Sequence, residues 1–427
     1  MALASTADKT TLSYTDAPAD LRWFVFALFF IFGGITSLND ILIPKLKHLF
    51  ELSHTEAMLI QFAFFIAYLL ISIPGAMLVK RLGYMRAASF GLLTMTVGCL
   101  IFIPASWSGL FVPFLLALFV LAAGITIVQV VANPLISVLG KPETAHSRLT
   151  FAQAFNSLGT TVFPFVGARL ILGSLEKVDE SALDAAGLAA YRAQESQVIT
   201  NTYIGLAIAL VIVALAVWTR RKRMPEMPQE PMRLFQSFDL LKQPRVAFGA
   251  LGIFLYVGAE VAIGSLIVAY LVQPHVLALP ERSAGELVAF YWGGAMVGRF
   301  IGSWLLQRFA PGLVLACAAL GACALLAISG LSTGTVAGWA LLAVGLMNSI
   351  MFPTIFSLAC EGLGERAPDG SGLMSTAIVG GAIVPLLTGV IADGATLALA
   401  LAMPAACYLG IALFARYCLR NPVLPLG

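Results

Sequence analysis

The sequence has very little charge for its length. Lys, Arg, Asp and Glu make up only 11% of its 427 residues, whereas a water-soluble domain carries about 25%. This shortage excludes an ordinary water-soluble globule. The net charge of +3 is too small to indicate a nucleic-acid-binding protein, and no basic patch with interleaved aromatics is present.

Several chemical motifs are absent as well. The four histidines fall in predicted loops without ligand spacing, and no GxSxG, HExxH or GxxxxGK[ST] stretch occurs. We therefore expect neither an enzyme nor an ATP-driven pump, and no cofactor. No pore-loop filter motif indicates a channel. No CxxC pair occurs, so we interpret the cysteines as small core residues rather than disulfide or metal ligands. They are Cys99, Cys317, Cys323, Cys360, Cys407 and Cys418.

Apolar residues are what the sequence has in quantity. They make up 59% of the chain, and the mean hydropathy is +0.92. A membrane-spanning helix needs about 20 mostly apolar residues, and the runs are continuous rather than alternating, which favours helices over a β-barrel. The sequence predicts an all-α membrane protein with twelve spans. They are residues 23–44, 57–79, 87–105, 110–138, 149–173, 201–219, 246–271, 284–306, 312–331, 335–360, 370–391 and 398–418.

The basic residues predict how the chain is oriented. Eighteen of the 25 Lys and Arg residues fall in the N-terminal tail, the even-numbered connections and the C-terminal end, against five on the other side. The positive-inside rule therefore places both termini in the cytoplasm. Residues 1–21 are polar and acidic, so we expect no cleavable signal peptide.

The chain divides into two halves with similar signals. We expect a cytoplasmic tail (1–21), a six-helix bundle (22–219), a cytoplasmic linker (220–245), a second six-helix bundle (246–420) and a short C-terminal tail (421–427). Such parallel repeats are typical of transporters. Three echoes recur in order in the two halves. They are Gly75 with Gly302, Pro134 with Pro353, and Gly159 with Gly380.

Two acids lie inside apolar runs. Asp40 ends the first predicted span, and Glu260 lies near the middle of the seventh. A charge at the bilayer centre costs about 2.5–3.5 kcal/mol on insertion scales, so such acids usually face a polar path. We predict that both bind the coupling cation, by protonation or by holding Na⁺, and that Glu260 also contacts substrate.

Amides and aromatic residues inside the spans predict a substrate site. Gln129 and Asn133 share a helix face by their spacing, as do Gln153 and Asn156. Amides donate and accept hydrogen bonds, which matches sugar hydroxyls, although helix–helix contacts also use amides. Aromatic rings stack on sugars or simply pack. The remaining predicted contacts are Asn39, Tyr256, Trp292 and Asn348.

These residues resemble the major facilitator superfamily, and more narrowly the fucose–galactose–glucose symporter family, over about residues 22–420. The resemblance implies a monosaccharide importer of the bacterial inner membrane, coupled to H⁺ or Na⁺. In the fucose members, an acid that matches Asp40 and a Glu at the position of Gln129 take part in proton coupling. The motifs that carry the likeness begin at Ser37, Gln129, Ala152, Tyr256 and Met351.

Two departures refine the resemblance. Gln129 cannot titrate, so Glu260 takes over part of the coupling, and the pattern is more similar to the glucose/galactose branch, which has N-acetylglucosamine-carrying relatives. The Asp usual in the turn after the second span is also missing, with Val79 near its place. The alternative within the fold is a drug/proton antiporter, whose cavity has fewer amides. We expect a monomer in a lipid bilayer, with no nucleic-acid partner.

Overall fold

The computed structural model describes residues 19–49, 54–108, 110–167, 185–222 and 236–423. Throughout these ranges, every regular element is a helix. The all-α fold predicted from the apolar runs is therefore confirmed. In α1, α2, α5, α6 and α8 some side chains near the helix ends lie outside the described part.

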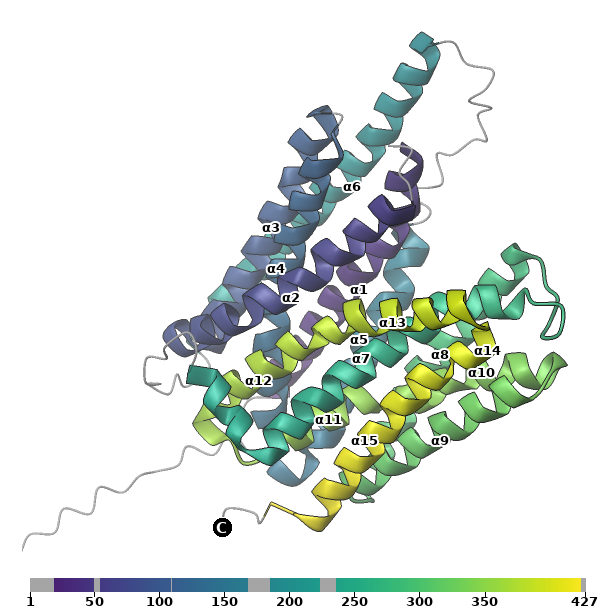
Figure 1. Ribbon diagram of the computed structural model, residues 1–427. Helices are drawn as coiled ribbons and strands as arrows, with labels where there is room; N and C mark the ends of the chain where they lie inside the picture. The colour runs from purple at the N-terminus through teal and green to yellow at the C-terminus, as the bar shows by residue number, and fades with distance from the viewer. Residues whose placement is uncertain (1–18, 50–53, 109, 168–184, 223–235, 424–427) are drawn as a thin grey trace, which may run out of the picture.

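The first half of the chain forms six long helices that pack side by side, drawn from purple to teal in Figure 1. The helix α3 packs against both α4 and α6, while α1 packs against α5. Their bounds are α1 (Ala19–Leu49), α2 (His54–Leu82), α3 (Tyr84–Ser108), α4 (Phe111–Val138), α5 (Ala145–Gly167) and α6 (Ala185–Thr219).

The second half contains more and shorter helices. The helix α15 packs against α7 and α9, and α10 packs against α8 and α9. The α-helices are α7 (Pro244–Leu271), α8 (Glu281–Leu305), α9 (Pro311–Leu331), α10 (Gly334–Asn348), α11 (Met351–Cys360), α12 (Ala367–Thr376), α13 (Gly380–Gly394), α14 (Leu397–Ala400) and α15 (Ala402–Arg420). Short 3₁₀ turns accompany the helices of this half at η5 (Gln236–Lys242), η6 (Gly364–Arg366) and η7 (Ala377–Val379), whereas η2 (Pro142–Thr144) lies between α4 and α5 in the first half.

Two predicted spans are divided rather than continuous. The span predicted over 335–360 consists of α10 and α11, and the span over 370–391 consists of α12, η7 and α13. The first division places Pro353 in the opening turn of α11, where the missing backbone N–H of proline is not needed. The division also places Asn348 at the end of α10 rather than inside one continuous helix.

Nine helical runs in the described residues are long and apolar enough to cross a membrane. The helices α1, α5 and α8 are not among them, and in α1 only the shorter apolar stretch Leu21–Ser37 is found. The helices α5 and α8 carry Gln153, Asn156 and Arg299, which lower their hydropathy. The count of twelve spans and the side on which the termini lie stay predictions.

One of the sequence echoes corresponds to the same packing in both halves. A Cβ atom at Gly159 in α5 would collide with the carbonyl oxygen of Phe30 in α1. A Cβ atom at Gly380, the first residue of α13, would collide with the carbonyl oxygen of Phe254 in α7. In each half, a glycine therefore allows the fifth predicted span to touch the backbone of the first, as expected for an internal repeat.

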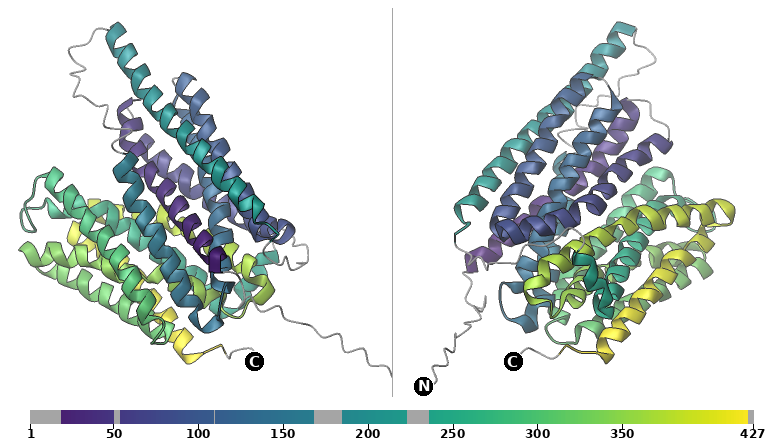
Figure 2. Two further views of the ribbon diagram at one scale, coloured as in Figure 1. Left: turned by 180° about the vertical axis from the view of Figure 1, so that it is seen from behind. Right: turned by 60° about the vertical axis from the view of Figure 1, so that its left-hand side comes forward.

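The two groups of helices meet at one end and diverge toward the other (Figures 1 and 2). At the end where they meet, α5 packs against α8 and α11, and α12 packs against α2 and α4. An ion pair crosses this closed end, because Lys80 Nζ lies 2.7 Å from Asp369 Oδ1. The Ser147 hydroxyl also donates to the carbonyl of Ser303 at 2.8 Å.

Candidate functional site

A buried acid on α7 is the centre of a polar cluster in the second half. Glu260 and Tyr256 are four residues apart, so their side chains share one face of the helix. The Tyr256 hydroxyl donates to Glu260 Oε1 at 2.7 Å. Tyr256 is fully buried and Glu260 is partly buried. A buried carboxylate needs such donors because removing it from water is costly.

A chain of hydrogen bonds connects this acid to three further helices. The Tyr291 hydroxyl on α8 lies 3.4 Å from the carbonyl oxygen of Glu260. Asn348 at the end of α10 donates to the Tyr291 oxygen at 2.7 Å and accepts from the Tyr408 hydroxyl of α15 at 2.6 Å. Asn348 and both tyrosines are completely buried. The network fixes the orientation of these rings around Glu260.

Arg299 of α8 links this cluster to the first half. Its Nε donates to the carbonyl of Ser349 at 3.2 Å, and its Nη1 donates to the carbonyl of Gln153 in α5 at 3.2 Å. The same nitrogen contacts the hydroxyl of Ser157. Arg299 also acts electrostatically on Glu260. A positive charge shared between the halves therefore lies near the buried acid.

The amides of the first half form a second cluster on α4 and α5. Gln129 accepts a hydrogen bond from the Tyr68 hydroxyl of α2 at 3.0 Å. Gln153 Nε2 lies 3.4 Å from Asn133 Oδ1, so the two predicted helix faces do meet. The Nδ2 group of Asn133 is buried and has no partner. A buried donor without a partner costs about 1–3 kcal/mol, and a ligand oxygen would satisfy it.

Two predicted site residues with described side chains, Asn156 and Trp292, have no hydrogen bond to these networks in the described part of the chain. Among the described residues, the side chain of Asn156 makes one long contact, in which its Nδ2 lies 3.4 Å from the carbonyl oxygen of Phe29. Trp292 is 46% exposed and packs edge-on against Tyr291, with ring centroids 5.0 Å apart. Asn39 and Asp40 belong to α1, but their side chains lie outside the described part.

Sequence reasoning did not single out Tyr68 or Tyr408. Both are tyrosines in the middle of apolar runs, and a buried tyrosine hydroxyl usually needs a partner. The sequence therefore indicates that each hydroxyl has a hydrogen-bond partner, but it does not indicate which residue that partner is. Within the described residues, no group of three metal-ligating side chains occurs.

Two groups of apolar helices that contain a partly buried acid and several buried amides are typical of a polytopic membrane transporter. Comparison with known proteins identifies the family. The sequence profile of the Major Facilitator Superfamily matches residues 24–385. The chain belongs to this superfamily.

The curated relatives are named as transporters. The chain is 49% identical to a glucose/galactose transporter of Brucella abortus over 388 residues, which are 91% of each chain. It is 35% identical to the L-fucose-proton symporter of Escherichia coli over 404 residues, which are 92% of this chain and 91% of the relative. These names describe transporters rather than enzymes.

Solved structures show the same fold. The crystal structure of the Escherichia coli fucose:proton symporter superposes with a TM-score of 0.85 at 31% identity, covering 95% of this chain and 99% of that one. A crystal structure of the same transporter, described as being in the outward conformation, gives 0.86 at 32% identity. The likeness extends over nearly the whole chain.

Proposed function

We propose that this protein imports a monosaccharide of the glucose/galactose type by symport with H⁺. The observation that carries the proposal is the partly buried Glu260, which accepts a hydrogen bond from Tyr256 and is influenced by the charge of Arg299, a cation that also bonds to the first half. The names of the two relatives support the substrate class and the coupling ion. N-acetylglucosamine, fucose and Na⁺ are the alternatives that the experiment below separates.

The proposed architecture follows the predicted boundaries. Twelve spans form two bundles, residues 22–219 and 246–420, with both termini in the cytoplasm of a bacterial inner membrane. Among the described residues, α5 and α8 are less apolar than the other long helices, and both carry proposed site residues. A polar lining of a transport path explains why such helices are less apolar than their neighbours.

The sugar binds between the two bundles in this proposal. The amides of Gln129, Asn133, Gln153 and Asn156 serve as donors and acceptors for its hydroxyls from one side. The unpartnered Nδ2 of Asn133 is a donor ready for a sugar oxygen. Glu260 contacts the sugar from the other side. Asn39, Tyr256, Trp292 and Asn348 complete the proposed set.

Protonation of Asp40 and Glu260 couples the cation to transport. A proton removes a buried negative charge, and it shifts the conformational equilibrium only if its affinity differs between the two states. Gln129 cannot take part because an amide does not titrate. In the arrangement described here the bundles diverge at the end opposite Lys80 and Asp369, and we assign it to the outward-open state.

Uptake into proteoliposomes tests this function. Labelled glucose, galactose, fucose and N-acetylglucosamine are supplied with an imposed H⁺ or Na⁺ gradient. We expect one or more of these sugars to accumulate under the H⁺ gradient. No accumulation in folded protein under either gradient would overturn the proposal, and accumulation only under Na⁺ would change the coupling ion.

Two variants then test the coupling residues. Glu260→Gln and Asp40→Asn keep side-chain size but cannot exchange a proton. We expect each to lose at least about tenfold in gradient-driven accumulation while retaining sugar exchange across the membrane without a gradient, because exchange needs no net proton transfer. A variant that concentrates sugar as well as the unmodified protein does has no coupling role.

A further inference from the structure

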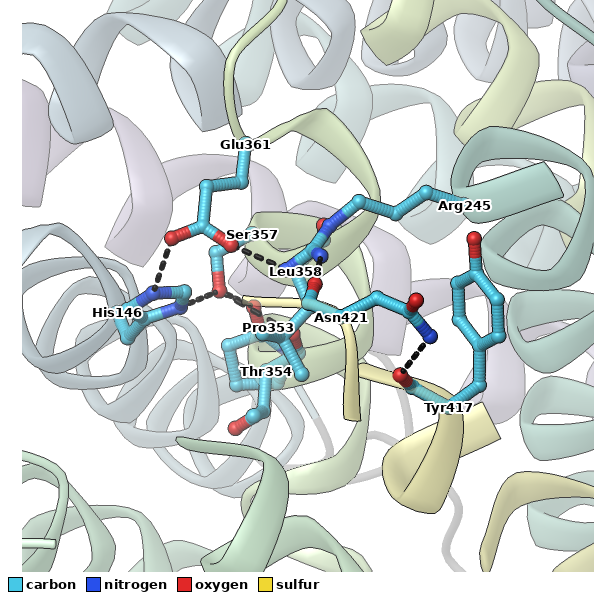
Figure 3. A network of polar contacts seen from close by, with 9 residues as sticks. All are labelled: His146, Arg245, Pro353, Thr354, Ser357, Leu358, Glu361, Tyr417 and Asn421. Carbon is cyan, nitrogen blue, oxygen red and sulfur yellow. Dashed lines mark hydrogen bonds and ion pairs between the residues drawn. The ribbon is translucent and has the colours of Figure 1, made fainter. Parts of the chain in front are cut away.

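A histidine at the closed end joins the two halves. His146 is the second residue of α5, although its position in the sequence suggested a loop. Its ring is buried, and its Nδ1 lies 2.7 Å from the Ser357 hydroxyl of α11. Its Nε2 lies 3.9 Å from Glu361 Oε1 (Figure 3). The helices α5 and α11 come from different halves, so these contacts exist only while this end is closed.

Glu361, the acid that faces His146, already forms an ion pair with another residue. Arg245 of α7 forms an ion pair with Glu361 and donates to the carbonyls of Leu358 at 2.7 Å and Asn421 at 2.8 Å. Figure 3 shows the Arg245 side chain directed at Glu361, on the side opposite His146. The carboxylate is therefore paired with a permanent cation, and a second positive charge on His146 gains little from it.

The other charged groups around the ring are also cations. Arg148 lies on the same helix, two residues after His146, and binds the carbonyl oxygens of Ser137 and Lys141. Arg22 and Glu143 in turn act on Arg148. Burial, followed by the charges of Arg245 and Arg148, lowers the pKa of His146 to about 4. The ring is neutral at the pH of the cytoplasm while this end is closed.

We propose that His146 is a second proton-binding site, separate from the transport acids, that binds a cytoplasmic proton when the halves part and holds them apart. A neutral ring bonds to Ser357 and bridges α5 to α11. A protonated ring would bring a third positive charge beside Arg245 and Arg148 in a buried place. Protonation therefore disfavours the closed arrangement and favours the one in which His146 faces water.

The direction of the pH effect follows from linkage. In water a histidine has a pKa of about 6.5, so the pKa is lowered in the closed state relative to the open one. The closed state keeps its full advantage above about pH 6.5 and loses it as the pH falls toward 4. Between pH 7.5 and 5.5, the ratio of open to closed protein should rise about tenfold.

This inference requires alternating access from the proposed function but neither the sugar nor Glu260. If the protein imports protons with its substrate, an acidified cytoplasm delays the return of the carrier to its outward-open state. His146 would then limit uptake before the proton load becomes damaging. The ligand of the site is the proton itself.

The test measures the distance across the closed end without substrate. Spin-labelled amino acids replace Arg81 at the end of α2 and Glu365 in η6, both of which are exposed. The full-length protein is placed in lipid nanodiscs at equal pH on both sides, and the distance distribution is recorded from pH 7.5 to 5.5. We expect the long-distance population to rise about tenfold relative to the short one.

Two variants make the test specific. His146→Gln is neutral at every pH and should remove the response, whereas His275→Gln, on an exposed loop residue, should keep it. A response that persists in His146→Gln, or its absence from the unmodified protein, overturns the proposal. Because no sugar or gradient is present, either result is independent of whether the protein transports a sugar.

A third variant covers the case in which His146→Gln does not fold. Ser357→Ala keeps the titrating ring but removes its partner across the interface. We expect a larger open fraction already at pH 7.5, with the pH response retained. An unchanged open fraction in Ser357→Ala would show that the His146–Ser357 contact does not hold the halves together, and it would overturn the proposal as well.

Discussion

The side chain of Asn348 joins three helices of the second half through hydrogen bonds. It donates to Tyr291 and accepts from Tyr408, and all three residues are fully buried. The Asn348→Ala variant would leave two tyrosine hydroxyls with fewer partners, at about 1–3 kcal/mol for each one left unsatisfied. We expect a clear fall in thermal stability, measured in detergent.

Asn201→Ala is the matched control for that measurement. Asn201 is exposed on α6, and its side chain accepts only a bond from Gln197. Its loss should change stability by less than about 0.5 kcal/mol. Equal stability of the Asn348 and Asn201 variants would mean that the tyrosine network contributes little.

The residues of this network also show how far sequence reasoning reaches. Glu260 and Asn348 were predicted because a polar group in an apolar run needs a reason to be there, and Tyr256 was predicted as a ring that stacks on a sugar. In the structure Tyr256 bonds directly to Glu260, and Tyr291 bonds to both Glu260 and Asn348. Tyr408 was not predicted, since its partner is sixty residues away in the chain. The role of Arg299 at the junction of the halves was equally unreadable, because spacing along one helix carries no information about another.

Among the helices, the contact between α13 and α7 depends on the absence of a side chain. A Cβ atom at Gly380 would collide with a backbone oxygen of α7, whereas a Cβ atom at Gly389 of α13 meets nothing within 4 Å. A backbone atom moves only if its helix moves, and overpacking of this kind costs about 1–3 kcal/mol. We expect Gly380→Ala to lower the melting temperature and Gly389→Ala to leave it unchanged.

The ion pair between α2 and α12 is the second contact that can be tested at this scale. Lys80 and Asp369 are 10% and 1% exposed, and Arg366 also bonds to Asp369 at 3.0 Å. The sequence lacks the Asp that the resemblance led us to expect after the second span, yet an ion pair joins the halves here. The partner acid stands 289 residues away, which is why hydropathy and motif reading missed it.

A double-mutant cycle with Lys80→Met and Asp369→Asn measures this pair. Removal of either partner leaves a buried charge, so we expect the summed stability losses of the two single variants to exceed the loss of the double variant. The coupling free energy should be about 1–3 kcal/mol. Additive losses would show that Arg366 alone neutralises Asp369.

On the scale of the whole molecule, the closed end must open during every transport cycle. The hydroxyl oxygens of Ser147 and Ser303 lie 3.1 Å apart, one in each half. We expect that Ser147→Cys together with Ser303→Cys forms a disulfide on oxidation, since the side chains are already in contact. The cross-linked protein should lose at least about tenfold in uptake, and reduction should restore it.

The single cysteine variants, oxidised in parallel, control for effects of the oxidant on the native thiols. Uptake at the original rate in protein shown to be cross-linked would mean that this end does not need to open. Alternating access between the two halves would then be wrong for this chain.

Besides the ion pair of Lys80 with Asp369, several small hydroxyl groups join the halves at the closed end. Ser147 bonds to Ser303, Ser371 bonds to the carbonyl of Val130, and Ser357 bonds to His146. Each such bond is worth only about 0.5–1.5 kcal/mol, because water replaces it nearly as well. Thermal motion therefore suffices to break these hydroxyl contacts and form them again as the two halves separate and close. An ion gradient needs only to bias the direction of this movement.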